Sequence, residues 1–411
     1  MHDVASQARA GASPRLLLQA PHRMMFFIGA GNLLLAMAWW AAWLVSTRWP
    51  DVLRMAQPTP YAGWLHAIVM QYQVLASFIF GFLLTVFPRW MGLPELRRAR
   101  YVPVGVGLFG GQLATLLGAC GWSAGIEVGV VSTLAGWLYA IATLAWLVMR
   151  ERGATWHARS CLAALSLGGV GLVAWTAFVF GASPIWAFVA IKVGTFGFLL
   201  PMYVTVAHRM FPFFASNVVA GYVPWRPLGL LAATWTLVVL HLTLELLHAY
   251  AWLWVADLGL LACTLVMCVR WWPIGPQPAL LRVLFIGFAW LPITFVLYAA
   301  QSIVYATTGA FALGRAPAHA LFIGFFGSVL VAMVTRVTQG HSGRPLRMPA
   351  AAWFAFCALQ VIAVVRVAAE LSADPMRWHA VAAIGWIVAL APWIARLGRI
   401  YLTARIDGKP G

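Results

Sequence analysis

Charged side chains are scarce in this sequence of 411 residues. Asp, Glu, Lys and Arg together make up only 9% of the chain, and hydrophobic residues make up 63%. Soluble domains carry about 25% charged residues, and a soluble core of this length would need far more polar surface to cover it. The composition therefore excludes a soluble globular protein and indicates a chain embedded in a membrane almost throughout.

Cysteine is also rare, and neither CxxC nor CxxCH occurs. This argues against a disulfide framework and covalent c-type haem attachment. The first 20 residues lack the short apolar core of a cleavable signal peptide. We therefore read the cysteines as small buried residues and expect the first long apolar run to be retained as a helix. The five cysteines are Cys120, Cys161, Cys263, Cys268 and Cys357.

Twelve apolar runs are long enough to cross a bilayer, which takes about 20 residues. Short connections join them, so we expect an all-α polytopic membrane protein with one transmembrane domain, 1–411, built as a bundle of about twelve helices. Pro201 and Pro292 fall inside the sixth and ninth runs and should kink them. The runs are 24–46, 60–87, 101–119, 125–149, 160–181, 184–207, 227–247, 251–271, 282–305, 317–338, 350–371 and 379–401.

The basic residues predict the orientation in the membrane. Twenty-one of the 27 Lys and Arg residues fall on the side of the N-terminus when the loops are numbered alternately, and four fall on the other side. Because cytoplasmic loops carry the excess of positive charge, both termini are expected in the cytoplasm. The net charge of +17 is then a topology signal. Nucleic acid is not expected as a partner, because that would require a basic face on a soluble module.

Five of the ten histidines are expected toward the outer ends of spans. Ionisable groups within a bilayer are costly and usually face the bundle interior, and neutral imidazole is the commonest metal ligand. A metal or haem site is one interpretation, and capping of helices at the membrane interface is the other. These histidines are His66, His241, His248, His319 and His379.

Two polar stripes run along otherwise apolar spans. Residues spaced by three or four positions share a helical face, so the stripes could hydrogen-bond to each other and only hold the bundle together. Alternatively their histidines bind a metal, and Glu245 or Gln73 accepts the remaining imidazole N–H. One stripe is His241, Glu245 and His248, and the other is His66, Met70, Gln73 and Ser77.

Isolated charges inside spans need partners as well. Arg366 and Glu370 are four residues apart and should form an ion pair, although Arg366 could instead bind a haem propionate. Lys192 lies near the middle of the sixth run, too deep to snorkel easily, so it is expected to line a polar cavity or a proton route. Acids near outer helix ends could form a proton-entry surface; they are Glu127, Glu245, Asp257, Glu370 and Asp374.

The stretch MVTRVTQGHSGRPL, residues 333–346, ends the tenth run at the inner surface. Gly340 and Gly343 are expected to allow a tight turn that presents His341 to His208 or His22. Two arginines of this stretch, Arg336 and Arg344, would then hold a haem propionate or the chain's own carbonyl groups. The alternative is a rigid cytoplasmic cap with no ligand.

Several motifs resemble those of the NnrS family, bacterial membrane proteins associated with nitric oxide. The most specific is HALFIGFFGSVLVAMVTRVTQGHSGRPL, residues 319–346; APHRMMFF (20–27), GFLLTVFPRW (81–90) and HRMFPFF (208–214) are also similar. One motif departs from the family. Its second helix often reads Trp-His-Ala-His-Glu, whereas residues 65–69 here are LHAIV, so that only His66 remains and the seventh span is a candidate source of replacements.

The resemblance implies haem b, with copper as a second metal, in a twelve-helix protein of the bacterial inner membrane. We expect nitric oxide and the lipid bilayer as partners and quinol as a candidate electron donor. Glu245 and Lys192 are the predicted catalytic residues. The predicted metal ligands are His66, His241, His248 and His319, and the predicted cofactor contacts also include His208, His341, Arg336, Arg344 and Arg366.

Three classes of function remain open from the sequence. The first, which we favour, is a haem-containing oxidoreductase that reduces nitric oxide, with quinol as the electron source. The second is a non-catalytic haem protein that senses nitric oxide or protects other metal sites from it. The third is a transporter of a small solute or metal, although transporters place their charges near the midplane and most of these histidines are expected nearer the outer face.

Overall fold

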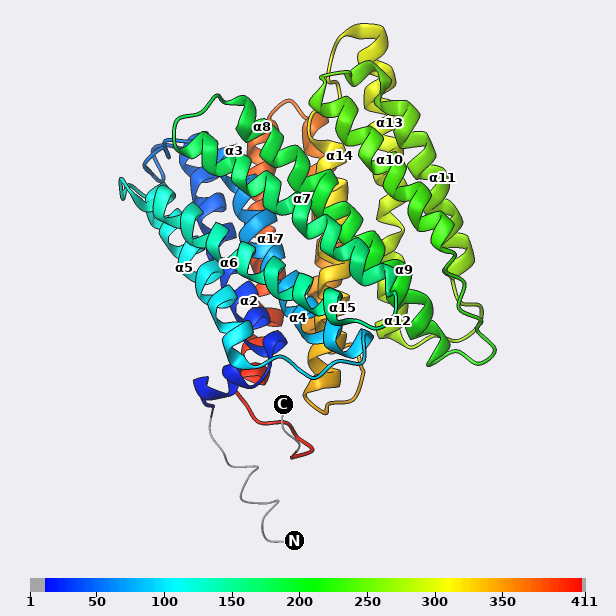
Figure 1. Cartoon of the computed structure of the whole chain (residues 1–411). Helices are drawn as coiled ribbons and strands as arrows, with labels where there is room; N and C mark the ends of the chain where they lie inside the picture. The colour runs from blue at the N-terminus through cyan, green and yellow to red at the C-terminus, as the bar shows by residue number, and fades with distance from the viewer. Residues whose placement is uncertain (1–11, 409–411) are drawn as a thin grey trace. The chain divides into compact units, whose positions relative to one another are not determined.

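A computed structural model describes residues 12–408 of the chain. This part is all helical, without a strand, and contains twelve helices long and apolar enough to cross a membrane, which confirms the predicted number (Figure 1). The largest boundary difference is in the sixth span, which continues to Ser216 rather than ending at 207. The spans are Pro21–Arg48, Ala62–Trp90, Val102–Ala119, Gly125–Arg150, Trp156–Val179, Ile185–Ser216, Leu228–Leu246, Tyr250–Trp271, Ala279–Thr308, Ala316–His341, Ala350–Leu371 and Pro375–Tyr401.

The chain divides into two compact units, each described here by itself. Unit 1 comprises residues 1–194, 334–346 and 390–411, and unit 2 comprises residues 195–333 and 347–389. A single transmembrane domain, as expected from the sequence, stays a prediction. Unit 1 contains η1 (Pro14–Gln19), α2 (Pro21–Arg48), α3 (Ala62–Ile68), η2 (Val69–Leu75), α4 (Ala76–Trp90), η3 (Arg98–Arg100), α5 (Val102–Ala119), α6 (Gly125–Arg150), α7 (Trp156–Val179) and α8 (Ile185–Lys192).

Unit 2 begins within η4 and includes the central part of the chain. Two long helices cross the unit boundaries, α15 at 333–334 and α17 at 389–390. The elements are η4 (Val193–Leu199), α9 (Leu200–Ser216), α10 (Leu228–Leu246), η5 (Tyr250–Trp252), α11 (Leu253–Trp271), α12 (Ala279–Phe288), α13 (Trp290–Thr308), α14 (Ala316–His319), η6 (Ala320–Gly327), α15 (Ser328–His341), α16 (Ala350–Ala368), η7 (Ala369–Leu371) and α17 (Pro375–Tyr401).

Three spans contain a π-helical segment within their first half. These segments are η2, η4 and η6, and they interrupt the second, sixth and tenth spans, which are four spans apart. The same three spans are the most buried of the twelve. Since π-helical turns are rare and often accompany functional sites, these three helices are where functional side chains are most expected.

The two prolines predicted to kink helices both lie just after a break. Pro201 is the second residue of α9, directly after η4, and Pro292 is the third residue of α13, after a break at Ala289. Proline has no N–H and cannot bond the carbonyl four residues earlier. Those carbonyls belong to Gly197 in η4 and Phe288 at the end of α12, so both interruptions have a local cause.

Helices α5 and α6 of unit 1 pack through glycines along their length (Figure 1). A Cβ atom on Gly107 would lie 2.8 Å from the Cα of Gly136, and one on Gly118 would lie 2.6 Å from the backbone nitrogen of Ile126. Small residues allow membrane helices to approach closely where no hydrophobic effect drives them together. This hairpin supports the polar side chains that η2 presents to it.

Candidate functional site

The centre of the candidate site is a buried His–Asp pair in unit 2. His241 of α10 places Nδ1 2.7 Å from Oδ1 of Asp257 on α11, and neither side chain is exposed. Helices α10 and α11 are neighbours joined by a short connection (Figure 1). At this distance Nδ1–H donates to the carboxylate, so Asp257 sets both the tautomer and the direction of the imidazole.

The other ring nitrogen of His241 remains available. Nε2 is buried without a hydrogen-bond partner, and the nearest carboxylate oxygen, Oε1 of Glu245, lies 3.7 Å away. The rings of Phe196 and Tyr298 enclose the imidazole, with centroids 3.9 and 5.4 Å from it. A buried imidazole normally satisfies both nitrogens, so this arrangement fits a histidine whose Nε2 binds a metal.

Asp257 therefore has the orienting role that the sequence suggested for Glu245. Glu245 lies four residues after His241 on the same helix, beside Nε2 rather than on Nδ1. In the sequence, Asp257 is only one of several acids near outer helix ends. The sequence signal that could have identified this pair is the similar distance of both residues from the turn between the two helices. His241 lies five residues before the end of α10, and Asp257 lies four residues after the start of α11, so the two face each other across the hairpin.

His248 does not continue the helical face of His241 and Glu245, so this part of the predicted stripe is wrong. Helix α10 ends at Leu246, and His248 adopts a left-handed conformation with φ of 57°. The N–H groups of His248 and Ala249 bond back to the carbonyls of Glu245 and Leu244, which is the Schellman pattern of a helix end. His248 is exposed, and its ring contacts Tyr250 at 5.7 Å between centroids.

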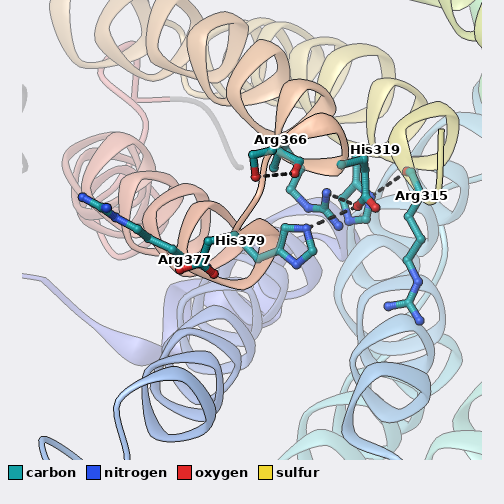
Figure 2. Close-up of polar contacts among 9 residues, drawn as sticks. Arg315, His319, Arg366, Arg377 and His379 are labelled. Carbon is teal, nitrogen blue, oxygen red and sulfur yellow. Dashed lines mark hydrogen bonds and ion pairs between the residues drawn. The ribbon is translucent and has the colours of Figure 1, made fainter. Parts of the chain in front are cut away.

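A second polar cluster in unit 2 contains the predicted Arg366–Glu370 ion pair. Arg366 Nη1 lies 2.5 Å from Glu370 Oε1, and His379 Nε2 of α17 approaches the same oxygen at 3.2 Å. Figure 2 shows the His379 ring directed at this pair. Gly314 packs against Glu370 so closely that a Cβ atom would collide with Oε2. Arg366 is thus bound to a protein carboxylate, which favours the ion pair over a haem propionate.

His319 lies near this cluster, because α14 packs against α16. Its Nδ1 is 2.9 Å from the carbonyl oxygen of Arg315, one helical turn earlier (Figure 2). It is also the last residue before the π-helical segment η6. Because a carbonyl oxygen can only accept, this backbone bond makes Nδ1 the donor and fixes the tautomer of the neutral imidazole.

His66 and Lys192 of unit 1 also adjoin π-helical segments. His66 precedes η2 by three residues, and its ring stacks on Trp40 with centroids 4.2 Å apart. Lys192 directly precedes η4, and its Nζ lies 5.5 Å from the ring centroid of Phe188. Gln73, suggested as a partner of His66, instead donates to Thr115 and Thr133 of the α5–α6 hairpin.

The predicted contact between His341 and His22 is present in unit 1. Their ring centroids lie 4.2 Å apart with an interplanar angle of 36°. The expected turn begins later than predicted, because α15 continues through Gly340 to His341 and only Gly343 has a positive φ, 72°. His208, the other suggested neighbour, belongs to unit 2 and places Nε2 3.1 Å from the carbonyl of Pro227.

Within residues 12–408, no group of three or more His, Cys, Asp or Glu side chains is arranged so that it could hold a metal ion. The predicted metal ligands His66, His241, His248 and His319 therefore stay a prediction. The same applies to the cofactor contacts proposed for Arg336, which lies in α15, and for Arg344, which follows it.

Comparison with known proteins agrees with the motifs found in the sequence. The family model described as NnrS protein matches residues 16–405, nearly the whole chain. No functionally curated protein is similar enough to be matched to it. With twelve apolar helices and a family match of this extent, the chain is a multi-pass membrane protein of the NnrS family.

Proposed function

We propose that this protein is a haem-binding protein of the bacterial inner membrane that acts on nitric oxide. We favour reduction of nitric oxide with quinol as the electron donor, and copper as a second metal. The observation that carries the proposal is the buried pair of His241 and Asp257, in which Nδ1 is held and Nε2 has no hydrogen-bond partner. Carboxylate–histidine pairs of this kind are typical of metal-binding sites.

His241 Nε2 is the atom that would hold a metal-bound cofactor, and Oε1 of Glu245 lies 3.7 Å from it. A haem iron or copper ion bound there would supply electron transfer and a binding position for nitric oxide. Phe196 and Tyr298 cover the imidazole and keep water away from it, which strengthens electrostatic interactions within the site.

The proton supply is the task that the chain's own carboxylates can perform. Reducing two molecules of nitric oxide to nitrous oxide and water consumes two electrons and two protons. Glu245 can hold a proton on Oε1 next to the site and release it when charge develops there. Asp257 lies on the Nδ1 side of the ring, whereas Glu245 lies beside Nε2, so Glu245 is the carboxylate placed next to the proposed binding position.

An optical spectrum of the purified protein tests the proposal directly. A Soret band that shifts on reduction and again on adding nitric oxide supports a haem protein. If protein purified from metal-replete membranes shows no Soret band, the proposal is contradicted. Turnover with a quinol analogue, measured as nitrous oxide formation, then separates a reductase from a non-catalytic nitric oxide binding protein.

Ligand variants locate the cofactor. We expect His241→Ala, His66→Ala and His319→Ala each to lose haem or copper while the protein still inserts into the membrane. Thr243→Ala is the control, because Thr243 is an exposed residue of α10 outside the predicted ligand set. Parental metal content in the first three variants would show that the metal is bound elsewhere, with His208 and His341 the next positions to test.

A further inference from the structure

The paired rings of His22 and His341 lie where α2 begins and α15 ends, in unit 1. His22 is 2% exposed, and its Nδ1 is buried without a hydrogen-bond partner. The backbone N–H of His22 is already used, because it donates to the hydroxyl of Thr85 at 3.1 Å. An unsatisfied imidazole nitrogen this deeply buried points to a group that is supplied from outside the chain.

Arg23 and Arg405 carry positive charge close to His22, and Arg344 lies close to Arg23. We call Arg23, Arg344 and Arg405 the arginine cluster. Arg23 is 2% exposed and donates from Nη1 to the carbonyl of Tyr401 at 3.2 Å. The guanidinium groups of Arg344 and Arg405 are close enough to repel it. Nη1 of Arg344 is itself buried without a hydrogen-bond partner.

The cluster has more positive than negative charge. Arg405 is paired with Asp407 through two bonds of 2.9 and 2.7 Å. Among residues 12–408, neither Arg23 nor Arg344 forms an ion pair with a carboxylate. Burial lowers the pKa of Arg344, and the positive charge of Arg396 lowers it further. Like charges in a partly buried setting repel one another, so a bound anion would stabilise the cluster.

We propose that the arginine cluster and the His22–His341 pair bind a phosphate group, either the headgroup of an anionic phospholipid or free phosphate. A phosphate offers several acceptor oxygens and up to two negative charges, which suits guanidinium groups that approach from three parts of the chain. Basic pockets between membrane helices on the cytoplasmic side commonly bind phospholipid headgroups. The expected cytoplasmic location of the chain ends agrees with the lipid source.

The proposal is tested on the full-length protein, delipidated in detergent, by its thermal midpoint. Phosphatidylglycerol is compared with phosphatidylcholine, and sodium phosphate with sodium chloride at equal ionic strength, since screening alone changes exposed charge interactions. We expect a rise in the midpoint with an anionic phosphate compound and not with its control. A response to phosphatidylglycerol alone identifies a lipid headgroup, and a response to both identifies phosphate itself.

Arg344→Gln removes one member of the cluster at a half-buried position and should still fold. It should weaken the anion-dependent effect by about 10- to 100-fold in concentration, as expected for the loss of a charged hydrogen bond. Arg97→Gln is the matched control, because Arg97 is an exposed arginine of unit 1 outside the cluster. The same response in both variants would overturn the proposal. Loss of haem from Arg344→Gln with unchanged anion binding would also overturn it, in favour of a cofactor carboxylate.

Discussion

Asp257 holds His241 across the α10–α11 hairpin, with 2.7 Å between Oδ1 and Nδ1 and neither side chain exposed. Two residues on different helices thus determine which imidazole nitrogen is free. This pairing makes Asp257 a positioning residue, distinct from Glu245, which faces the free nitrogen.

Replacing Asp257 should separate its positioning role from a merely structural one. Asp257→Ala leaves Nδ1–H buried without an acceptor, so it should lower stability by about 1–3 kcal/mol and metal or haem affinity by about 10- to 100-fold. Asp257→Asn keeps an acceptor oxygen and should recover most of the stability. The measurements are the thermal midpoint, the metal content and the reduction potential of the bound cofactor. If the cofactor in Asp257→Asn has the same reduction potential as in the parent protein, the carboxylate charge of Asp257 does not act on the site through His241.

Glu245→Gln should separate binding from turnover. The amide keeps the size of the side chain beside His241 Nε2 but cannot carry a proton, so haem content should be retained. Nitrous oxide formation should fall by about 10²- to 10⁴-fold, the usual contribution of a positioned proton donor. Thr243→Ala, an exposed position on the same helix, serves as the control. Parental turnover in Glu245→Gln would exclude this carboxylate as the proton donor.

Gly314→Ala tests the packing of Glu370 against the loop before α14. Gly314 has φ of 48°, and a Cβ atom there would collide with Glu370 Oε2. Gly309→Ala provides a matched control, since Gly309 has φ of 71° but a Cβ atom would meet nothing within 4 Å. Both variants should lose about 1–2 kcal/mol from left-handed strain. Only Gly314→Ala should lose more, because Glu370 must move away from Arg366 and His379. Equal thermal midpoints for the two variants would contradict this prediction.

Tyr72→Phe probes the support of the π-helical segments. The Tyr72 hydroxyl in η2 donates to the carbonyl of Ala190 at 2.7 Å, two residues before the end of α8, and is fully buried. Removing it should cost about 1–3 kcal/mol, since the carbonyl loses a partner where no water can replace it. Tyr139→Phe removes a similar bond to the carbonyl of Ala99 at an exposed residue, and should cost about 0.5 kcal/mol or less. The comparison of thermal midpoints checks the difference.

Properties that depend on neighbouring residues were predictable from the sequence. The twelve spans follow from the length of each apolar run, because a helix in a bilayer satisfies its own backbone hydrogen bonds. The ion pair of Arg366 and Glu370 follows from their spacing of four on one helix. The π-helical segment before Pro201 and the break at Ala289 before Pro292 have a local cause in the missing proline N–H, and a kink at either proline stays a prediction. Each of these is decided within about one helical turn or one apolar segment.

The tertiary structure decided the properties that depend on contacts between several helices. The choice of Asp257 over Glu245 as the partner of His241 results from the packing of α11 against α10. The left-handed conformation of His248 results from the Schellman hydrogen bonds that end α10. It could not be predicted from the sequence, because the position is not occupied by glycine or asparagine, the residues that usually adopt this conformation. The π-helical segments shift hydrogen bonds by one residue without changing the apolar pattern, so hydropathy cannot reveal them. The sequence alone determined a membrane protein of twelve spans with histidines within and beside them. Packing determined which nitrogen of His241 can bind a ligand, because hydrogen-bond direction depends on the neighbouring helix.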